Sequence, residues 1–233
     1  MEQNNGFIDM DDLAEYDVEF VEPIHINYRG YDICEIPPNG QGITALMAMN
    51  LMKRQHYESL DATTIHRQIE AIKIAFSDTM TYVTDPKFMK MNPNFLLSES
   101  YVDQRIGDIL SEASLHQPID YQKSGTVYLA TADNEGNMVS FIQSNYMGFG
   151  SGIVIDGTGI SMQNRGHTFS LDQSHHNRLE PRKRTYHTII PGFIMKDGKA
   201  IGPFGVMGGF MQPQGHLQVI MNMLDFKMDP QSA

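Results

Sequence analysis

The chain has 233 residues, of which 41% are hydrophobic and 19% are charged, ordinary proportions for a globular protein with one large core or two small ones. Its formal net charge of −11 disfavours nucleic acid and anionic membrane as partners. Cys34 is the only cysteine, which excludes an intrachain disulfide and a thiolate zinc site.

The segment before Arg29 is acidic and contains no Lys or Arg, a pattern that predicts a solvated face. Within it, "IDMDDLAEYDVEF" predicts a short helix that leads into a strand. The start has no charged region followed by an apolar stretch, and no apolar run is long enough to cross a bilayer. We therefore expect a cytoplasmic protein without a membrane partner.

Residues 24–83 predict a hairpin followed by two helices. Alternating apolar residues on both sides of Arg29-Gly30 indicate the hairpin, and the turn cluster "PPNGQG" follows it. The Met-rich run "ITALMAMNLMKR" predicts the first helix, and residues 63–83 predict the second, capped by Asp61 or Thr63. The apolar face of the second helix comprises Ile65, Ile69, Ile72, Phe76 and Met80. Residues 84–124 are polar and irregular, and within them "DPKFMKMNPNFLLSES", residues 85–100, predicts a surface loop.

Strand patterns dominate from Thr126 onward. "TVYLATA" and "NMVSFIQS" flank a turn at residues 133–136, and counting back from this turn places Thr126 opposite Gln143 or Ser144. A second hairpin turns at Asp197-Gly198. The following helix, "PQGHLQVIMNMLDF", has one apolar side made of Leu217, Ile220, Met221 and Leu224. Helices before the sheets and another after them predict a layered α+β protein.

Thr126 is the first candidate for chemistry, because it follows Ser124-Gly125 at the start of a strand. Small residues before a Thr let its hydroxyl reach the preceding carbonyl, so an N-to-O acyl shift would cut the chain between Gly125 and Thr126. The freed α-amine would then serve as base for the hydroxyl of the same residue. Taken alone, an isolated Thr at this place is more often simply a β-branched residue in a strand.

Three further positions could complete such a site. Ser144 could hydrogen-bond the hydroxyl or the amine of Thr126, although a strand Ser facing water fits equally well. The Gly208-Gly209 pair joins a strand to a helix, where free N–H groups can hold an oxyanion or simply make a tight connection. Arg165 could clamp a carboxylate, although a solvated surface Arg is the commoner case.

Neither a metal site nor a nucleotide site is predicted. His167, His175 and His176 have no recognised ligand spacing and no matched carboxylate. The Gly-rich segments lack the Lys of a P-loop and the βαβ setting of a dinucleotide site. The proposed Thr chemistry requires no cofactor.

The ordered blocks "GTVYLATADNEGNMVSF", "GFGSGIVIDGTGISMQN", "PRKRTYHTIIPGFIMKDGK" and "GVMGGFMQPQGHLQV" resemble the small subunit of the γ-glutamyltranspeptidase family of N-terminal-nucleophile hydrolases. The residues before them resemble the later part of its large subunit. The resemblance implies a four-layer αββα sandwich, of which this chain is an incomplete part. It also implies that residues 1–125 and 126–233 belong to the two subunits and form one intertwined domain.

The resemblance also implies roles for individual residues. It makes Thr126 the nucleophile, Ser144 its supporting hydroxyl, and Gly208 and Gly209 the oxyanion donors. The paired serines that lie near substrate in the family correspond here to His187 and Thr188. The three family residues that hold the substrate α-amine correspond to Tyr146, Arg165 and Thr168.

The departures from the family pattern change the expected substrate. A carboxylate is lost and a cation gained at the α-amine site, so the pocket should reject an ammonium and accept an anion. The Thr that usually follows the nucleophile is Val127. "NRG", "HTIIP" and "GVMGG" resemble the branch of oxamate amidohydrolases and cephalosporin-acylase-like proteins.

These residues predict an amidohydrolase or acyltransferase for a small carboxylate-bearing amide. Two alternatives remain open: a true γ-glutamyltransferase acting on glutathione, and an unprocessed, non-catalytic precursor or binding module. The expected partners are the small-molecule substrate and the two subunits of one precursor, with no nucleic acid and no membrane. The resemblance leaves a homodimer open.

Overall fold

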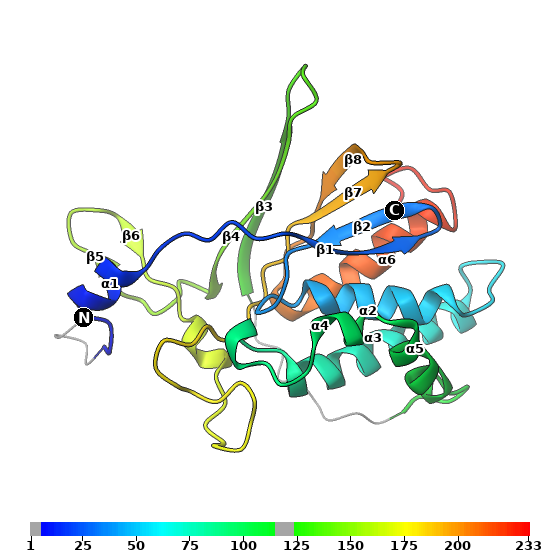
Figure 1. Ribbon diagram of the computed structural model, residues 1–233. Coiled ribbons are helices and arrows are strands. Elements are labelled where there is room, and N and C mark those ends of the chain that lie inside the picture. The colour runs from blue at the N-terminus through cyan, green and yellow to red at the C-terminus, as the bar shows by residue number, and fades with distance from the viewer. Residues whose placement is uncertain (1–5, 115–123) are drawn as a thin grey trace.

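A computed structural model describes residues 6–114 and 124–233 (Figure 1). The α-helices are α1 (Met10–Glu15), α2 (Gly42–Lys53), α3 (Ala62–Tyr82), α4 (Pro93–Leu96), α5 (Glu99–Arg105) and α6 (Gln212–Leu224). Short 3₁₀ turns are η2 (Pro86–Phe88), η3 (Ile106–Asp108), η4 (Arg165–Thr168) and η5 (Gly209–Met211). The strands are β1 (Ile24–Tyr28), β2 (Tyr31–Glu35), β3 (Ser124–Ala132), β4 (Met138–Met147), β5 (Val154–Ile155), β6 (Ile160–Ser161), β7 (Gly192–Lys196) and β8 (Lys199–Phe204).

The main sheet has four antiparallel strands in the order β1-β2-β7-β8. The two hairpins expected at Arg29-Gly30 and Asp197-Gly198 are both in this sheet, and their two-residue turns have positive φ at both positions: 54° and 84°, and 51° and 72°. Such turns match the twist of the flanking strands. The pairing of β2 with β7 joins segments that lie far apart in the sequence.

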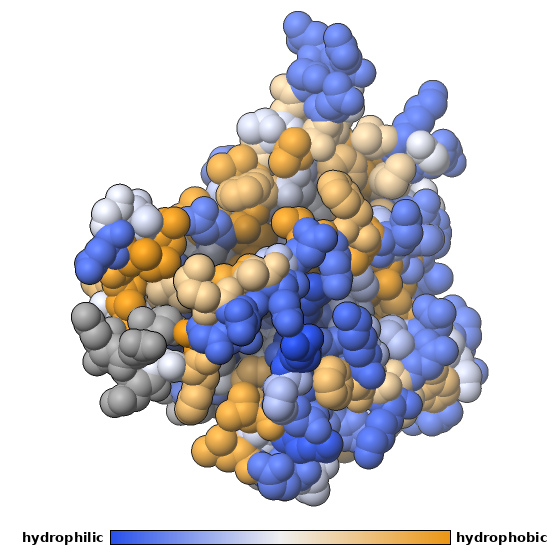
Figure 2. All heavy atoms as spheres, turned by 60° about the vertical axis from the view of Figure 1, so that its left-hand side comes forward, coloured by the Kyte–Doolittle hydropathy of each residue, from blue (hydrophilic) through white to orange (hydrophobic). Residues whose placement is uncertain are grey.

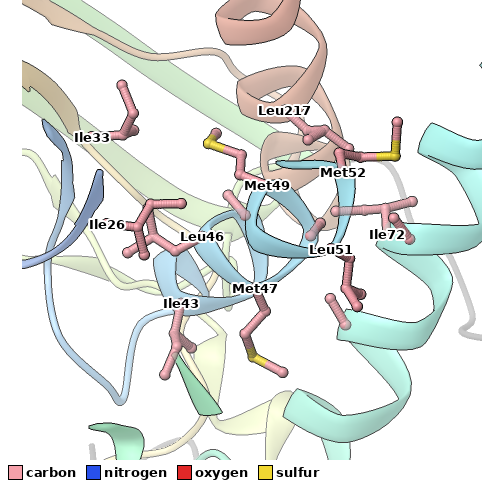
Figure 3. Close-up of a cluster of buried hydrophobic side chains, with 14 of the residues drawn as sticks. Ile26, Ile33, Ile43, Leu46, Met47, Met49, Leu51, Met52, Ile72 and Leu217 are labelled. Atoms are coloured by element: carbon pink, nitrogen blue, oxygen red, sulfur yellow. The ribbon is translucent and has the colours of Figure 1, made fainter. Parts of the chain in front are cut away.

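Helix α2 lies at the centre of the core, where it contacts β1 and β2 of the sheet and the helices α3 and α6 (Figure 3). Its residues from Gly42 to Met52 are all buried, so it packs on every side. In Figure 3, Leu46 points toward Ile26 of β1, and Leu51 lies beside Ile72 of α3. The flexible Met side chains fill the spaces between these elements.

A buried Glu–His pair lies where α6 meets the sheet. The Nδ1 atom of His216 lies 2.6 Å from Oε1 of Glu35, and both side chains are fully buried. Burial raises the pKa of Glu35, although the pairing with His216 opposes that rise. The pair ties the end of β2 to α6.

The apolar face predicted for α6 is confirmed, because its four expected residues are all buried. The face predicted for α3 is partly wrong: Ile65 and Ile69 are 39% and 43% exposed. Burial shifts along the helix to residues that include Ala71 and Ala75, and α3 packs against α2.

The surface loop expected at residues 85–100 is wrong, because this segment contains α4 and the start of α5 and buries Asp85 and Leu96. Asn92 and Ser98 cap these helices by accepting backbone N–H groups. In the wider segment expected to be polar and irregular, Thr84, Tyr101 and Val102 are buried as well. Residues 115–123 of this wider segment lie outside the described residues. The strand expected after α1 does not form, and residues 16–22 run as an exposed arm (Figure 1).

The β3–β4 hairpin extends away from the helices and contacts β8 (Figure 1). Its tip is hydrophilic and apolar side chains follow below it, as Figure 2 shows. The exposed apolar residues of the hairpin are Val127, Leu129, Val139 and Phe141. Within residues 6–114 and 124–233, no helix is long and apolar enough to cross a membrane.

Candidate active site

Thr126 and Ser144 face each other near the open end of the β3–β4 hairpin. The register pairs Thr126 with Ser144, one of the two partners that the sequence allowed, and shifts between Gly125 and Thr126. The Thr126 hydroxyl donates to Oγ of Ser144 at 3.2 Å, and Thr126 is only 9% exposed. The irregularity therefore coincides with the peptide bond that self-cleavage would break.

The Ser144 hydroxyl links Thr126 to the carbonyl of the preceding residue. It donates to the Gly125 carbonyl oxygen at 3.1 Å and accepts the Tyr146 backbone N–H at 2.9 Å. Together with the Thr126 hydroxyl, these bonds use the one donor and two acceptor sites of a serine. The donated bond polarises the carbonyl that Thr126 would attack.

Tyr146 has a backbone conformation that is unusual for a residue with a side chain. Its φ is 74°, in the left-handed region that favours glycine. The ring is 5% exposed and lies under the Arg165 guanidinium, whose central carbon is 5.0 Å from the ring centroid. Strained residues of this kind concentrate at functional sites.

Arg165, in η4, is a buried cation without a carboxylate partner among the described residues. The side chain is 2% exposed, and Nη1 donates to the Thr188 hydroxyl at 2.5 Å. Within the described part of the chain, Nε and Nη2 have no hydrogen-bond partner. Burial lowers the pKa of Arg165 to about 10, which still leaves it protonated at neutral pH. A desolvated cation with two open donors favours an anionic ligand.

His187 is held as a neutral donor beside Arg165. Burial, and then the charge of Arg165, lower the pKa of His187 to about 3. Nδ1 accepts the Ile189 N–H at 3.3 Å, so the proton of the neutral ring lies on Nε2. The imidazole therefore offers an N–H to a ligand.

The Thr168 hydroxyl is engaged within its own loop. It contacts the carbonyls of Arg165 and Tyr186 and the hydroxyl of Thr185, each at 2.8 Å. These bonds fix the loop that carries Arg165. A direct contact between Thr168 and substrate stays a prediction.

Gly208 and Gly209 form the turn between β8 and α6. Their φ values are 132° and 60°, which a residue with a Cβ rarely adopts. Neither backbone N–H donates a hydrogen bond within the described residues, and β3 contacts η5, which begins at Gly209. Both N–H groups are therefore available to an oxyanion.

Gln41 is a site neighbour that the sequence did not reveal. Its side-chain Nε2 donates to the carbonyls of Thr188 and Gly209, at 2.6 and 2.8 Å. The sequence marked residues 37–42 only as a turn cluster and loop. The available signal was the continuous apolar run after it, since a helix buried on every side also buries the residues at its start.

The contacts therefore form a chain across the site. Thr126 bonds Ser144, Ser144 bonds the backbone of Tyr146, and the Tyr146 ring lies against Arg165. Arg165 bonds Thr188, whose carbonyl shares the amide of one glutamine with Gly209.

The family model described as gamma-glutamyltranspeptidase matches residues 1–233.

The chain belongs to the gamma-glutamyltranspeptidase family.

Solved and curated relatives agree with this membership. The crystal structure of cephalosporin acylase from Bacillus halodurans matches with a TM-score of 0.88 and 55% identity, over 98% of this chain and 42% of that one. The glutathione hydrolase-like YwrD proenzyme of Bacillus subtilis (strain 168) is 40% identical over 99% of this chain and 45% of its own length. The oxamate amidohydrolase proenzyme of Klebsiella pneumoniae is 34% identical over 89% of this chain and 39% of its own length.

The expected family and α+β fold class are thus confirmed. The chain spans less than half the length of the curated relatives it matches. Those gamma-glutamyltranspeptidase-family relatives are named proenzymes, in keeping with the expected processing into large and small subunits. The subunit boundary at Gly125-Thr126 and the residue roles stay predictions for this member.

Proposed function

We propose that this chain carries the catalytic centre of a self-cleaving Thr amidohydrolase for small amides whose acyl part bears a carboxylate. One observation carries the substrate class: a desolvated Arg165 with two open donor atoms. The hydrogen bonds from Thr126 to Ser144 and from Ser144 to Gly125 support the self-cleavage.

Self-cleavage begins with attack of the Thr126 hydroxyl oxygen on the Gly125 carbonyl carbon. The carbonyl oxygen gains negative charge, which the Ser144 hydroxyl stabilises. The C–N bond breaks and its nitrogen takes the proton, leaving an ester between Gly125 and the Thr126 oxygen. Water hydrolyses the ester, so Gly125 ends as a carboxylate and Thr126 gains a free amine and a free hydroxyl.

In turnover, the α-amine of Thr126 accepts the hydroxyl proton as the oxygen attacks the substrate amide carbon. The N–H groups of Gly208 and Gly209 hold the oxyanion. The amide C–N bond breaks, and the leaving amine takes the proton from the α-ammonium. Water, deprotonated by the same α-amine, then attacks the acyl-enzyme ester. The ester bond to the Thr126 oxygen breaks, this oxygen takes the proton back from the α-ammonium, and the acid is released.

The pocket around Arg165 selects an anion because its polar groups are donors. The guanidinium brings charge and two free N–H-bearing atoms, and His187 adds a neutral N–H. A substrate ammonium would lie beside a buried cation with no carboxylate to receive it. This opposes a γ-glutamyl substrate, whose α-carbon carries an ammonium beside its carboxylate.

The glutathione hydrolase-like relative keeps the γ-glutamyl alternative as the second candidate. A γ-glutamyl anilide and oxamate therefore form the two arms of one substrate comparison. Release of the aniline at a rate comparable to oxamate hydrolysis would favour the second candidate.

The test starts with intact mass spectrometry of the full-length protein beside its Thr126→Ala variant. The expected result is two fragments that meet at Gly125 and Thr126, absent from the variant. A single uncut chain in both samples would remove the free amine and favour the non-catalytic precursor.

Arg165→Gln then tests the substrate class. It should lower kcat/KM for oxamate by about tenfold to a hundredfold, the range expected for a lost charge-assisted hydrogen bond, while self-cleavage continues. Arg178→Gln is the matched control, because Arg178 pairs with Glu180 within its own loop. An unchanged preference for anionic amides in Arg165→Gln would refute the pocket assignment.

A further inference from the structure

Gln41 lies at the start of α2 and is completely buried. Its backbone N–H donates to the His187 carbonyl at 2.9 Å, and its side chain reaches in a different direction, to Thr188 and Gly209. One residue of the first half of the chain therefore contacts two separate loops of the second half.

The chemistry of the two bonds fixes which side-chain atom makes them. Carbonyl oxygens only accept hydrogen bonds, so the amide nitrogen must face both, and its two hydrogens are then fully used. The Oε1 atom of Gln41 has no partner within the described residues. Both bonds are shielded from water, so breaking them leaves buried carbonyls unsatisfied.

The two carbonyls belong to the two halves of the proposed site. The hydroxyl of Thr188 is the partner of Arg165, which would bind the substrate carboxylate. Gly209 supplies one of the two N–H groups that would bind the oxyanion. A single amide therefore sets the separation between the anion pocket and the oxyanion turn.

We propose that Gln41 is a positioning residue that fixes the distance between the substrate carboxylate and the reacting carbonyl, and so selects acyl groups by length. This inference rests on the proposed function. A loop displacement of about 1 Å is enough to lower a rate by about a hundredfold, so loss of the hydrogen bonds that Gln41 makes to both loops should have a large effect on the rate.

The test compares Gln41→Met with Gln68→Met in the full-length protein. Gln68 is also buried, but within the described residues its Nε2 donates to the sulfur of Met221 in the core and not to a loop carbonyl. Each change removes one buried amide and keeps the side-chain length, so a general packing loss affects both variants alike.

Two measurements separate positioning from stability. Hydrogen exchange should speed up in Gln41→Met at residues 186–190 and 207–212 together, and not in Gln68→Met. The second measurement is hydrolysis of oxamate and of its homologues with one and two extra methylenes. In Gln41→Met, kcat/KM for the best substrate should fall at least about tenfold, and the ratio of kcat/KM between the best and the worst chain length should become smaller.

Gln41→Glu provides a second variant if Gln41→Met fails to fold. A carboxyl group of the same shape has at most one hydrogen to donate, so it can keep at most one of the two bonds. Faster hydrogen exchange in at least one of the two loops is expected, together with the same decrease in the ratio of kcat/KM between chain lengths.

Unchanged exchange in both loops, or a length preference within about twofold of wild type, would overturn the inference. Failure of the proposed function gives a different pattern, because wild-type protein would then hydrolyse no carboxylate-bearing amide. The exchange measurement alone would in that case decide whether Gln41 holds the two loops together.

Discussion

Ser144 carries three hydrogen bonds on one oxygen, and each has a different consequence. One orients the nucleophile, one polarises the Gly125 carbonyl, and one fixes the backbone of strained Tyr146. Replacing it with Ala should slow self-cleavage by about tenfold or more, because the developing oxyanion loses a donor. Timed mass spectrometry after synthesis measures this rate.

Ser140→Ala is the control for that change, because Ser140 lies on the same strand and bonds Tyr128 instead. Ser144→Thr keeps a hydroxyl and should retain most of the rate. Equal cleavage rates in Ser144→Ala and Ser140→Ala would show that the bond to Gly125 is unimportant for processing.

His187 should make the protein less stable in mild acid. Its pKa is about 3 in the folded state, far below the ordinary value near 6.5, because the ring is buried beside Arg165. Between these values the unfolded chain binds a proton that the folded chain does not, so stability falls as pH falls through this window. The contribution is at most about 1.4 kcal/mol per pH unit.

Chemical denaturation between pH 7 and pH 4 measures this slope. His187→Gln should lose less stability over that range than wild type. His25→Gln, at an exposed position of β1, is the control for removing a histidine. A His187→Gln slope equal to that of wild type would mean that the imidazole is solvated in the folded protein.

At the scale of elements, the approach of α2 to β2 depends on a missing side chain. A Cβ at Gly42 would lie 2.7 Å from the Cβ of Glu35, whose carboxylate holds His216. Gly42→Ala should therefore lower the free energy of unfolding by about 1–3 kcal/mol, the usual cost of overpacking. Urea denaturation checks it.

Gly107→Ala is the matched control, because a Cβ there meets nothing within 4 Å. It should be neutral or slightly stabilising, since Ala restricts the unfolded chain. Similar stabilities for the two variants would show that α2 can move away from the sheet at no cost.

The elements that the sequence predicted correctly are those whose signal is local. Arg29-Gly30 and Asp197-Gly198 specify their own turns, and the α6 face follows from residues three and four apart. The opposition of Thr126 and Ser144 followed from one hairpin count.

The elements that the sequence missed depend on distant partners. Ile65 and Ile69 fit an apolar stripe, but they are exposed, and α3 buries Ala71 and Ala75 instead. Helices α4 and α5 are too short for a clear period, and their few apolar residues find pockets made by other segments. The apolar run after Gln41 could have indicated its burial, but not its partners, because these are backbone carbonyls, which every residue has.

For the molecule as a whole, the main sheet and core combine both sides of the Gly125-Thr126 bond. Strand β2 pairs with β7, α2 and α3 contact α6, and Tyr28 donates to Asp225 at 2.6 Å. The fragments produced by cleavage should therefore stay together in native buffer.

Size-exclusion chromatography followed by denaturing electrophoresis tests this expectation. Cleaved protein should elute as one native peak that contains both fragments, and the fragments should separate only in denaturant. Two native peaks would contradict the shared sheet and would show that residues 1–125 and 126–233 separate after cleavage.

Because β2 and β7 lie on opposite sides of the Gly125-Thr126 bond, cleavage of this bond changes the kinetic order of folding. Before the cut, these strands meet by closing a loop within one chain, at a rate independent of concentration. After the cut, the same contact is an encounter between two molecules, and its equilibrium depends on dilution. A cleaved molecule that unfolds at nanomolar concentration should therefore refold more slowly and less completely than the uncut chain, because its two fragments must first meet.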